Sequence, residues 1–183
     1  MVAADPDKCQ KQPSRQGDPE SFEIVVREHQ RMIHSLCYRM TGSLADAEDL
    51  AQETFIQAYR HWAGFRAEAR FSSWLYRIAV NCCLNWRKRA ARLDRLHKEW
   101  SAEEQGMEIG EPGQIYRVQA ALMKLNPKQR AAVVLTTYDG LTHAEAAKAL
   151  GCSETTVSWR LFAARRILKR ILKDSPNRAA PDE

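Results

Sequence analysis

Residues 142–168 read THAEAAKALGCSETTVSWRLFAARRIL and predict a pair of helices joined by a tight turn. Thr142 stands three residues before Glu145, the capping-box spacing in which a hydroxyl and a carboxylate satisfy the free N–H groups of a helix start. Gly151 is suited to end the first helix, and Ser153 to cap the second. This pattern is typical of a DNA-binding helix-turn-helix, whose second helix enters the major groove; an ordinary helical hairpin is the alternative.

The rest of the chain also predicts helices. Apolar residues recur at helical spacing in 22–38, in a segment capped by Ser43, and from Phe71 onwards, and no segment alternates with the period of a strand. Helices are further predicted over 114–125 and from Asn126–Pro127 to Tyr138, because asparagine caps a helix and proline fits its first turn. The fold is therefore predicted to be all-α.

Charge is distributed unevenly along the 183 residues, whose formal net charge is +5. Residues 71–100 and 142–173 each contain seven Lys or Arg against two acids, whereas residues 43–56 contain four acids and no base. Two basic segments separated by an acidic one indicate nucleic acid contacted at two places and a protein partner elsewhere. Helical periodicity fades over about 93–113, which contains five glutamates, three glycines and a proline, so residues 93–112 read as an acidic linker.

Several classes of function find no support in the sequence. Five scattered cysteines (Cys9, Cys37, Cys82, Cys83 and Cys152) form no CxxC pair and indicate reduced thiols in a cytosol rather than disulfides or zinc ligands. No apolar run reaches the length of a membrane span, and no signal-peptide core begins the chain, so a cytoplasmic protein without membrane insertion is expected. No phosphate-binding loop or nucleophile motif occurs, and we expect no catalytic residue, metal site or cofactor.

The segment from Phe71 carries a polar face opposite its apolar stripe. Its members are spaced three or four apart and are Arg77, Asn81, Asn85, Lys88 and Arg92. Cations can neutralise phosphates, and asparagine can hydrogen-bond base edges. Just upstream, Phe65, Arg66 and Arg70 combine a ring that can stack on an unpaired base with two cations for its backbone. The alternative is a solvated polar face with Phe65 packed inward.

The acidic segment DAEDLAQETF, residues 46–55, presents Asp46, Asp49, Gln52 and Glu53 away from its apolar stripe. Paired carboxylates can bind a metal, but no histidine or cysteine joins them here. Their spread along one helix face suits a cationic protein surface better, with a merely solvated face as the alternative.

Three stretches together resemble the bacterial extracytoplasmic-function sigma factors of RNA polymerase. They are SFEIVVREHQRMIHSLCYRMTGSLADAEDLAQETFIQAYRHW (21–62), FRAEARFSSWLYRIAVN (65–81) and LNPKQRAAVVLTTYDGLTHAEAAKALGCSETTVSWRL (125–161). The resemblance covers about 18–92 and 113–173. DAEDLAQETF followed by FSSWLYRIAVN is highly specific, whereas the helix-turn-helix alone is not.

The resemblance implies a domain organisation: a disordered tail (1–17), sigma region 2 (18–92), the flexible linker (93–112), sigma region 4 (113–175) and a C-terminal tail (176–183). It implies that the acidic helix docks on the β′ clamp helices of core RNA polymerase, and that region 4 also binds the β flap. An anti-sigma factor is a further expected partner.

The resemblance also implies two contacts with promoter DNA. Region 2 would hold the −10 element as a melted strand with a flipped base, using Phe65, the 66–73 loop and Asn81, with Trp74 and Arg77 in support. Region 4 would read the −35 element as a duplex through Thr155, Thr156, Ser158, Trp159, Arg160, Phe162, Arg165 and Arg166.

One departure from the family concerns the reading helix. The family usually has T-V-x-S-R with a basic residue at x, whereas this chain has Thr156-Val157-Ser158-Trp159-Arg160. The cation is missing at Ser158, and an indole replaces serine at 159. Trp159 and Phe162 face away from Val157 and suit contact with thymine methyl groups, or packing on polymerase or a regulator.

The sequence thus predicts a sigma factor without chemistry of its own. A free-standing helix-turn-helix repressor is the first alternative and predicts tight duplex binding without polymerase. A helical adaptor is the second and predicts no salt-sensitive affinity for DNA. The acidic helix favours the sigma factor, because a plain repressor has no evident use for it.

Overall fold

The computed structural model describes residues 19–62, 71–98 and 114–173, and every regular element in these ranges is helical. The all-α prediction is therefore confirmed. The elements are α1 (Pro19–Thr41), α2 (Leu44–Arg60), α3 (Phe71–Lys98), α4 (Gln114–Met123), α5 (Pro127–Val133), the π-helical segment η3 (Val134–Tyr138), α6 (His143–Leu150) and α7 (Glu154–Lys173).

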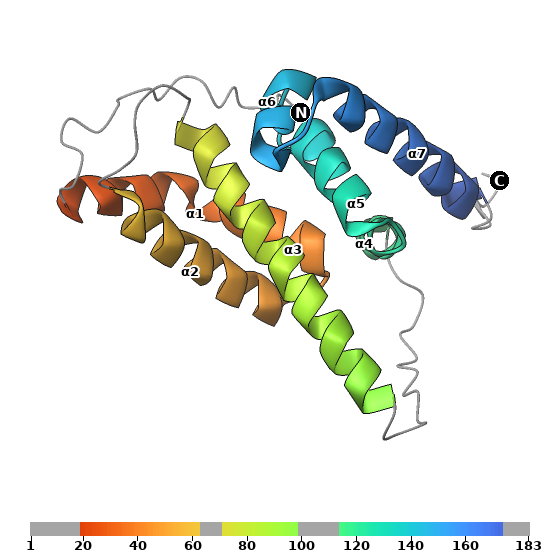
Figure 1. Ribbon diagram of the computed structural model, residues 1–183, viewed down its shortest axis with the longest axis horizontal. Coiled ribbons are helices and arrows are strands. Elements are labelled where there is room, and N and C mark those ends of the chain that lie inside the picture. Colours follow the sequence, from red (N-terminus) through yellow and green to blue (C-terminus); the bar gives the residue numbers. More distant parts are fainter. Residues whose placement is uncertain (1–18, 63–70, 99–113, 174–183) are drawn as a thin grey trace, which may run out of the picture.

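The helices form two groups that meet along α3 (Figure 1). Helices α1, α2 and α3 pack on one another through their apolar stripes, and α5, α6 and α7 form the second group with α4 at its edge. Helix α6 packs on α3, and α4 packs on α1. Buried side chains of both groups belong to one continuous apolar core. The two regions predicted from the sequence therefore lie against each other here.

The predicted helix ends are present. Ser43 caps α2, accepting a hydrogen bond from a first-turn N–H. Asn126 and Thr142 each form a capping box, and in the second the N–H of Glu145 donates to the Thr142 hydroxyl at 3.2 Å. Gly151 ends α6 in the left-handed conformation, at φ 58° and ψ 44°. Local sequence thus sets the orientation of α7 at the turn.

Two boundaries differ from the sequence pattern. Helix α3 continues to Lys98, past residue 92, where the first unit was expected to end. The helix that begins at Pro127 changes to π geometry from Val134, and the N–H of Asp139 donates to the carbonyl of Val134 at 3.1 Å. Such wide turns are rare and usually brief, and apolar periodicity does not signal them.

Arg130 on α5 joins the two groups. Its side chain is fully buried and donates to the carbonyls of Leu122, Met123 and Leu125 at 2.8, 2.8 and 3.2 Å, and to that of Met40 on α1. These carbonyls lie at or just beyond the ends of α4 and α1, where the last turn of a helix has no partner of its own. Burial lowers the pKa of Arg130 to about 10, so the guanidinium stays charged at neutral pH. One side chain therefore caps two helix ends.

A second polar cluster lies at the same junction. Arg39 of α1 lies over the ring of Tyr138, 4.5 Å from its centroid. Asp139, in the turn before α6, has one carboxyl oxygen that is buried and has no hydrogen-bond partner among the described residues. Burial raises the pKa of Asp139 to about 7, against the opposing effect of Arg39. Burial and the nearby Asp139 raise the pKa of Tyr76 on α3 above its usual value.

We expect Asp139 to make stability depend on pH. An acid whose pKa is raised in the folded state keeps its proton while the unfolded chain has lost it, so stability falls between about pH 4 and about pH 7. Asp139→Asn removes this contribution, which amounts to at most about 1.4 kcal/mol per pH unit. Urea unfolding of both proteins from pH 4 to 8 measures it, and parallel stability curves would contradict it.

Gly42, which follows α1, is predicted to resist substitution. Its φ of +81° lies in the left-handed region, and an added Cβ would lie 3.1 Å from Sδ of Met123 on α4. Gly42→Ala should lower the free energy of unfolding by about 1–2 kcal/mol for the backbone, with a smaller further loss from crowding. Gly140→Ala is the matched control, because its φ is +69° but no atom lies within 4 Å of the added Cβ. Equal losses in thermal or urea unfolding would show that the contact with Met123 contributes nothing.

Candidate polymerase and nucleic-acid interfaces

The acidic face of α2 is open to solvent. Asp49, Gln52 and Glu53 are exposed, whereas Asp46 in the first turn is half-buried. The opposite face, including Leu50 and Thr54, is buried against the bundle. Thus three of the four predicted polymerase-binding side chains are accessible on one helix face. Asp46 lies at the helix start, where its negative charge is favourable.

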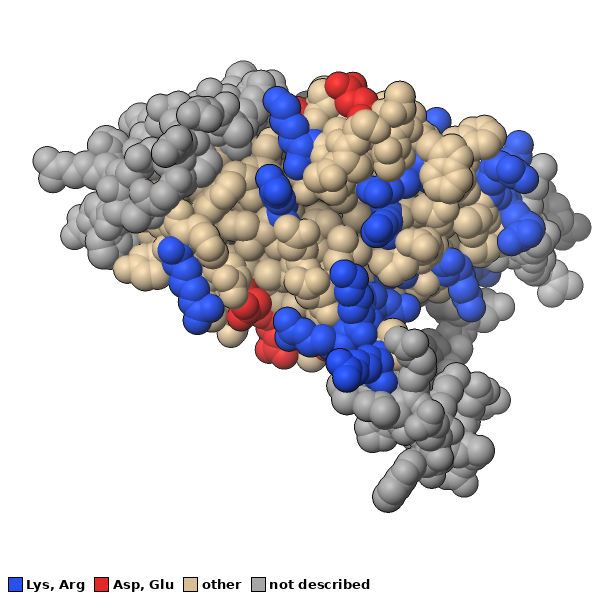
Figure 2. Space-filling view, viewed as in Figure 1, with Lys and Arg blue, Asp and Glu red and all other residues tan. Residues whose placement is uncertain are grey.

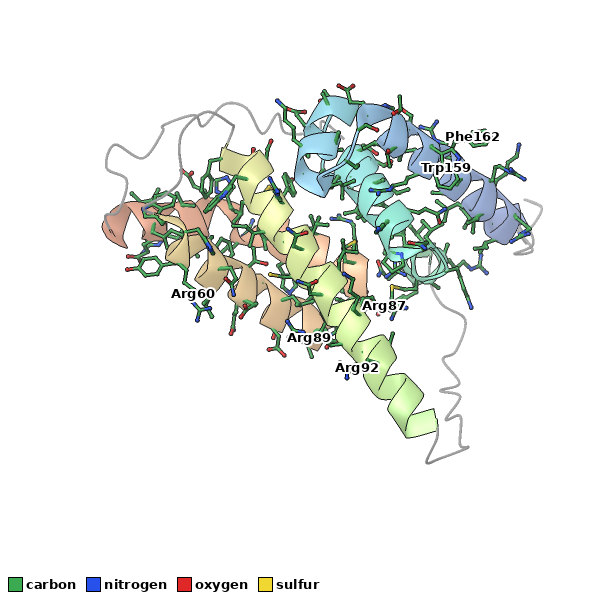
Figure 3. All side chains as sticks on the ribbon, in the orientation of Figure 1. Arg60, Arg87, Arg89, Arg92, Trp159 and Phe162 are labelled. Atoms are coloured by element: carbon green, nitrogen blue, oxygen red, sulfur yellow. The ribbon has the colours of Figure 1, made fainter. Side chains whose placement is uncertain are left out.

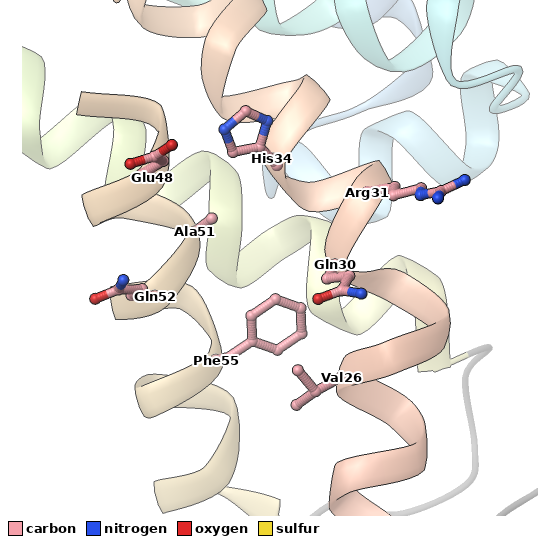
Figure 4. Close-up of a pocket in the computed structure, with 8 residues that line it drawn as sticks. All are labelled: Val26, Gln30, Arg31, His34, Glu48, Ala51, Gln52 and Phe55. Atoms are coloured by element: carbon pink, nitrogen blue, oxygen red, sulfur yellow. The ribbon is translucent and has the colours of Figure 1, made fainter. Parts of the chain in front are cut away.

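A groove of about 430 Å³ runs beside this face, between α1 and α2 (Figure 4). Its lining residues are Val26, Gln30, Arg31, His34, Glu48, Ala51, Gln52 and Phe55. Gln52 thus belongs both to the acidic face and to the groove. The α1 side of this groove was not predicted from the sequence. Gln30, Arg31 and His34 lie within four residues of one another, so they share one side of the helix, and this spacing could have indicated it.

The predicted polar face of α3 is exposed. Arg77, Asn81, Asn85 and Lys88 are all accessible, and they follow one another at helical spacing. Trp74 is instead half-buried, with its ring centroid 5.4 Å from that of Phe71. Phe71 in turn contacts His29 and Trp62, at centroid distances of 5.3 and 5.6 Å. The structure therefore places Trp74 in an aromatic cluster at the start of α3.

Three further residues of the predicted −10 site, Phe65, Arg66 and Arg70, lie outside the described residues.

Additional cations extend the basic surface beyond the predicted set. Arg87, Arg89 and Arg92 lie together on the second half of α3, whereas Arg60 lies apart on α2 (Figure 3). In the space-filling view, Lys and Arg gather over the lower part of α3 and along α7, with few acids between them (Figure 2). Arg87 and Arg89 were not singled out from the sequence, because they lie off the strict helical stripe. A phosphate backbone needs cations over an area rather than a line.

Helix α7 presents most of its predicted reading residues outward. The exposed ones are Thr155, Ser158, Trp159, Phe162, Arg165 and Arg166, and the half-buried ones are Thr156 and Arg160. Val157, Leu161 and Ala164 are buried on the other side, against α5 and α6. The helix-turn-helix geometry inferred from the sequence is thus present, with the reading side free.

Polar side chains at the start of α7 form hydrogen bonds within the helix-turn-helix. The Ser153 hydroxyl lies 2.8 Å from the hydroxyls of both Thr155 and Thr156. The Ser158 hydroxyl lies 3.1 Å from Nδ1 of His143 on α6. Arg160 donates to the sulfur of Cys152 at 3.5 Å. These groups hold the start of α7 in place relative to the turn.

The described cysteines are free thiols. Cys37 and Cys83 are buried, and their sulfur atoms lie 3.8 Å apart between α1 and α3. The hydrogen bond to Cys37, together with burial, raises the pKa of Cys83, and burial raises that of Cys82. A raised thiol pKa disfavours the reactive thiolate at neutral pH. Cys9 lies outside the described residues.

Neither a metal cluster nor a membrane span is found in the described ranges. No group of three or more His, Cys, Asp or Glu side chains there is placed to hold a metal ion. No helix of the described chain is both long and apolar enough to cross a bilayer.

Two family models match the chain, one over each of its two helical groups. Sigma-70 region 2 matches residues 25–93, and Sigma-70, region 4 matches residues 115–168. The first covers most of α1, all of α2 and most of α3, and the second covers nearly all of α4 through to most of α7. The two helical groups therefore correspond to regions 2 and 4 of a sigma-70-type transcription factor.

Curated relatives show which kind of sigma factor the chain is similar to. The chain is 36% identical over 159 residues to the ECF RNA polymerase sigma factor SigM of Mycobacterium tuberculosis, covering 85% of this chain and 79% of the relative. It is 32% identical over 175 residues to SigW of Bacillus subtilis, covering 87% and 93%.

Solved structures share the fold of this chain. The sigma factor RpoE, in complex with the anti-sigma factor NepR from Bartonella quintana, shares the fold with a TM-score of 0.71 at 22% identity, covering 86% of this chain and 99% of that one. CnrH, in complex with the cytosolic domain of CnrY, gives 0.67 at 28% identity, covering 87% and 92%. The chain belongs to the extracytoplasmic-function (ECF) RNA polymerase sigma factors, which direct promoter-specific initiation of transcription.

Proposed function

We propose that this sigma factor uses three separate surfaces, one for core RNA polymerase and two for promoter DNA. The exposed acidic face of α2, with Asp49, Gln52 and Glu53 at its centre and Asp46 at its start, docks on the β′ clamp helices of core RNA polymerase. Carboxylates in an exposed row attract a cationic helix surface, and such pairs set orientation as well as association rate. The adjoining groove gives the docking helices an apolar floor at Phe55 and Val26.

The α3 surface holds the −10 element as a single strand. Arg77, Lys88 and the neighbouring arginines neutralise its phosphates, while Asn81 and Asn85 offer hydrogen bonds to unpaired base edges. Phe65, Arg66, Arg70 and Trp74 complete this site, with a flipped base stacked on an aromatic ring. Unpairing costs a few kcal/mol, and stacking returns about 1–3 kcal/mol per base.

Helix α7 reads the −35 element as a duplex. Its exposed residues lie on the side away from the core, as major-groove entry requires. The proposal keeps the domains 18–92 and 113–175 and the acidic linker at 93–112, with α3 continuing to Lys98 into the first part of that linker. Region 4 also contacts the β flap. The protein performs no chemistry, works in the cytoplasm with polymerase, and is held inactive by an anti-sigma factor, as the NepR complex of RpoE suggests by analogy.

The observation that carries the proposal is the segregation of charge on exposed helix faces. Acids without cations occupy the docking face of α2, and cations dominate α3 and α7. Run-off transcription with purified core polymerase on a library of promoter fragments tests it. Initiation that requires the chain supports the proposal. Duplex binding by the chain alone, with no transcript, would favour a repressor, and failure of both would favour an adaptor.

A further inference from the structure

Two aromatic side chains stand out on the reading side of α7. Trp159 and Phe162 are 66% and 61% exposed, and they lie next to each other along the outer edge of the molecule (Figure 3). Their spacing of three residues places both rings on one side of the helix. Large apolar side chains that are adjacent and exposed mark a surface that is covered when the protein acts.

Most polar side chains at the start of α7 already have a hydrogen-bond partner inside the protein. The hydroxyls of Thr155 and Thr156 both hydrogen-bond the Ser153 hydroxyl, and that of Ser158 hydrogen-bonds Nδ1 of His143. Arg160 donates to the sulfur of Cys152. The largest exposed side chains in the first half of α7 are the apolar rings of Trp159 and Phe162. Base recognition at this point has to rely on apolar contact more than on hydrogen bonds.

Cations follow the pair along α7. Arg165, Arg166 and Lys169 follow it and are exposed, and the guanidinium carbon of Arg166 lies 6.0 Å from the ring centroid of Phe162. An apolar centre beside a cationic rim matches a major groove, where phosphates line the edges and thymine methyl groups project into the floor. This charge complementarity favours duplex DNA over a protein partner.

We propose that Trp159 and Phe162 recognise thymine in the −35 element by contact with its C5-methyl group. The inference rests on the proposed role of α7 as the −35 reading helix. Thymine alone among the bases presents a methyl group in the major groove. Uracil keeps the O4 acceptor and loses only the methyl, so it separates apolar contact from any hydrogen bond donated by the indole N–H.

The test uses holoenzyme reconstituted from the full chain and core RNA polymerase. Promoter fragments with a randomised −35 window are selected for retention, and the best fragments are resynthesised with uracil in place of each thymine in that window. Wild-type holoenzyme should bind about fourfold more weakly for each contacted methyl removed, the factor expected for one buried methyl-sized group. Trp159→Ala should bind the thymine fragment more weakly and lose the difference between thymine and uracil, and Phe162→Ala should do so at a neighbouring position.

Tyr116→Ala is the matched control, because this ring is 63% exposed and belongs to α4 rather than to the reading helix. It should keep the full preference for thymine. Equal binding of thymine and uracil fragments by the wild type would overturn the inference and leave −35 reading by α7 standing. If the holoenzyme selected no −35 sequence beyond the background found with core polymerase alone, the proposed −35 role of α7 would be overturned, and the inference with it.

Discussion

Arg130→Met is expected to lower the free energy of unfolding by about 3–5 kcal/mol, the range found when one partner of a buried charged group is removed. Methionine fills similar space but removes the arginine donor from the carbonyls of Met123, Leu125 and Met40, and from that of Leu122, which keeps only the N–H of Leu125. Each buried carbonyl left unpaired costs about 1–3 kcal/mol, although relaxation and water entry reduce the sum. Urea unfolding followed by circular dichroism gives the value.

Two companion variants identify the source of the loss. Arg117→Met removes an exposed arginine from α4 and should change stability by less than about 0.5 kcal/mol. Arg130→Lys keeps the charge but not the planar group that reaches several carbonyls at once, so most of the loss should remain. A lysine variant as stable as wild type would show that charge alone matters at this position.

Asp49→Ala combined with Glu53→Ala is expected to reduce transcription by at least about tenfold at limiting concentrations of the chain. Both carboxylates are exposed on the face proposed to dock on polymerase, and loss of charged contacts across an interface costs about 1–2 kcal/mol or more in total. Neither side chain belongs to the core, so the fold should be unchanged. Run-off transcription across a titration of the variant measures the effect, which should shrink as its concentration rises.

Glu23→Ala combined with Glu28→Ala is the control for net charge, because it removes two exposed carboxylates from α1. It should transcribe close to wild type. The α2 variant should also retain binding to −35 duplex, since α7 is untouched. Equal loss of transcription in both double variants would mean that overall charge, rather than the α2 face, determines the activity.

Much of this protein could be predicted from its sequence because the relevant signals are local. The caps at Ser43, Asn126 and Thr142 and the left-handed Gly151 depend on residues within a few positions of one another. Apolar spacing also indicated which sides of α2, α3 and α7 would face solvent, since one turn of helix brings every third or fourth residue to the same side. Exposure of Asp49, Asn81 and Trp159 follows from that geometry.

Other features depended on contacts between distant segments. Arg130 bonds to the end of α1, ninety positions away in the chain, and the periodicity of α5 gives no sign of it. The groove beside Gln52 needs α1 as its second wall, and the aromatic cluster at the start of α3 needs His29 of α1 and Trp62 beside Phe71. The sequence alone therefore determined the helices, their capped ends and their outward faces, because these follow from hydrogen bonding and side-chain spacing along one segment. Only the tertiary structure decided how the two regions meet and which polar groups are already paired, because burial and pairing depend on what the rest of the chain brings alongside.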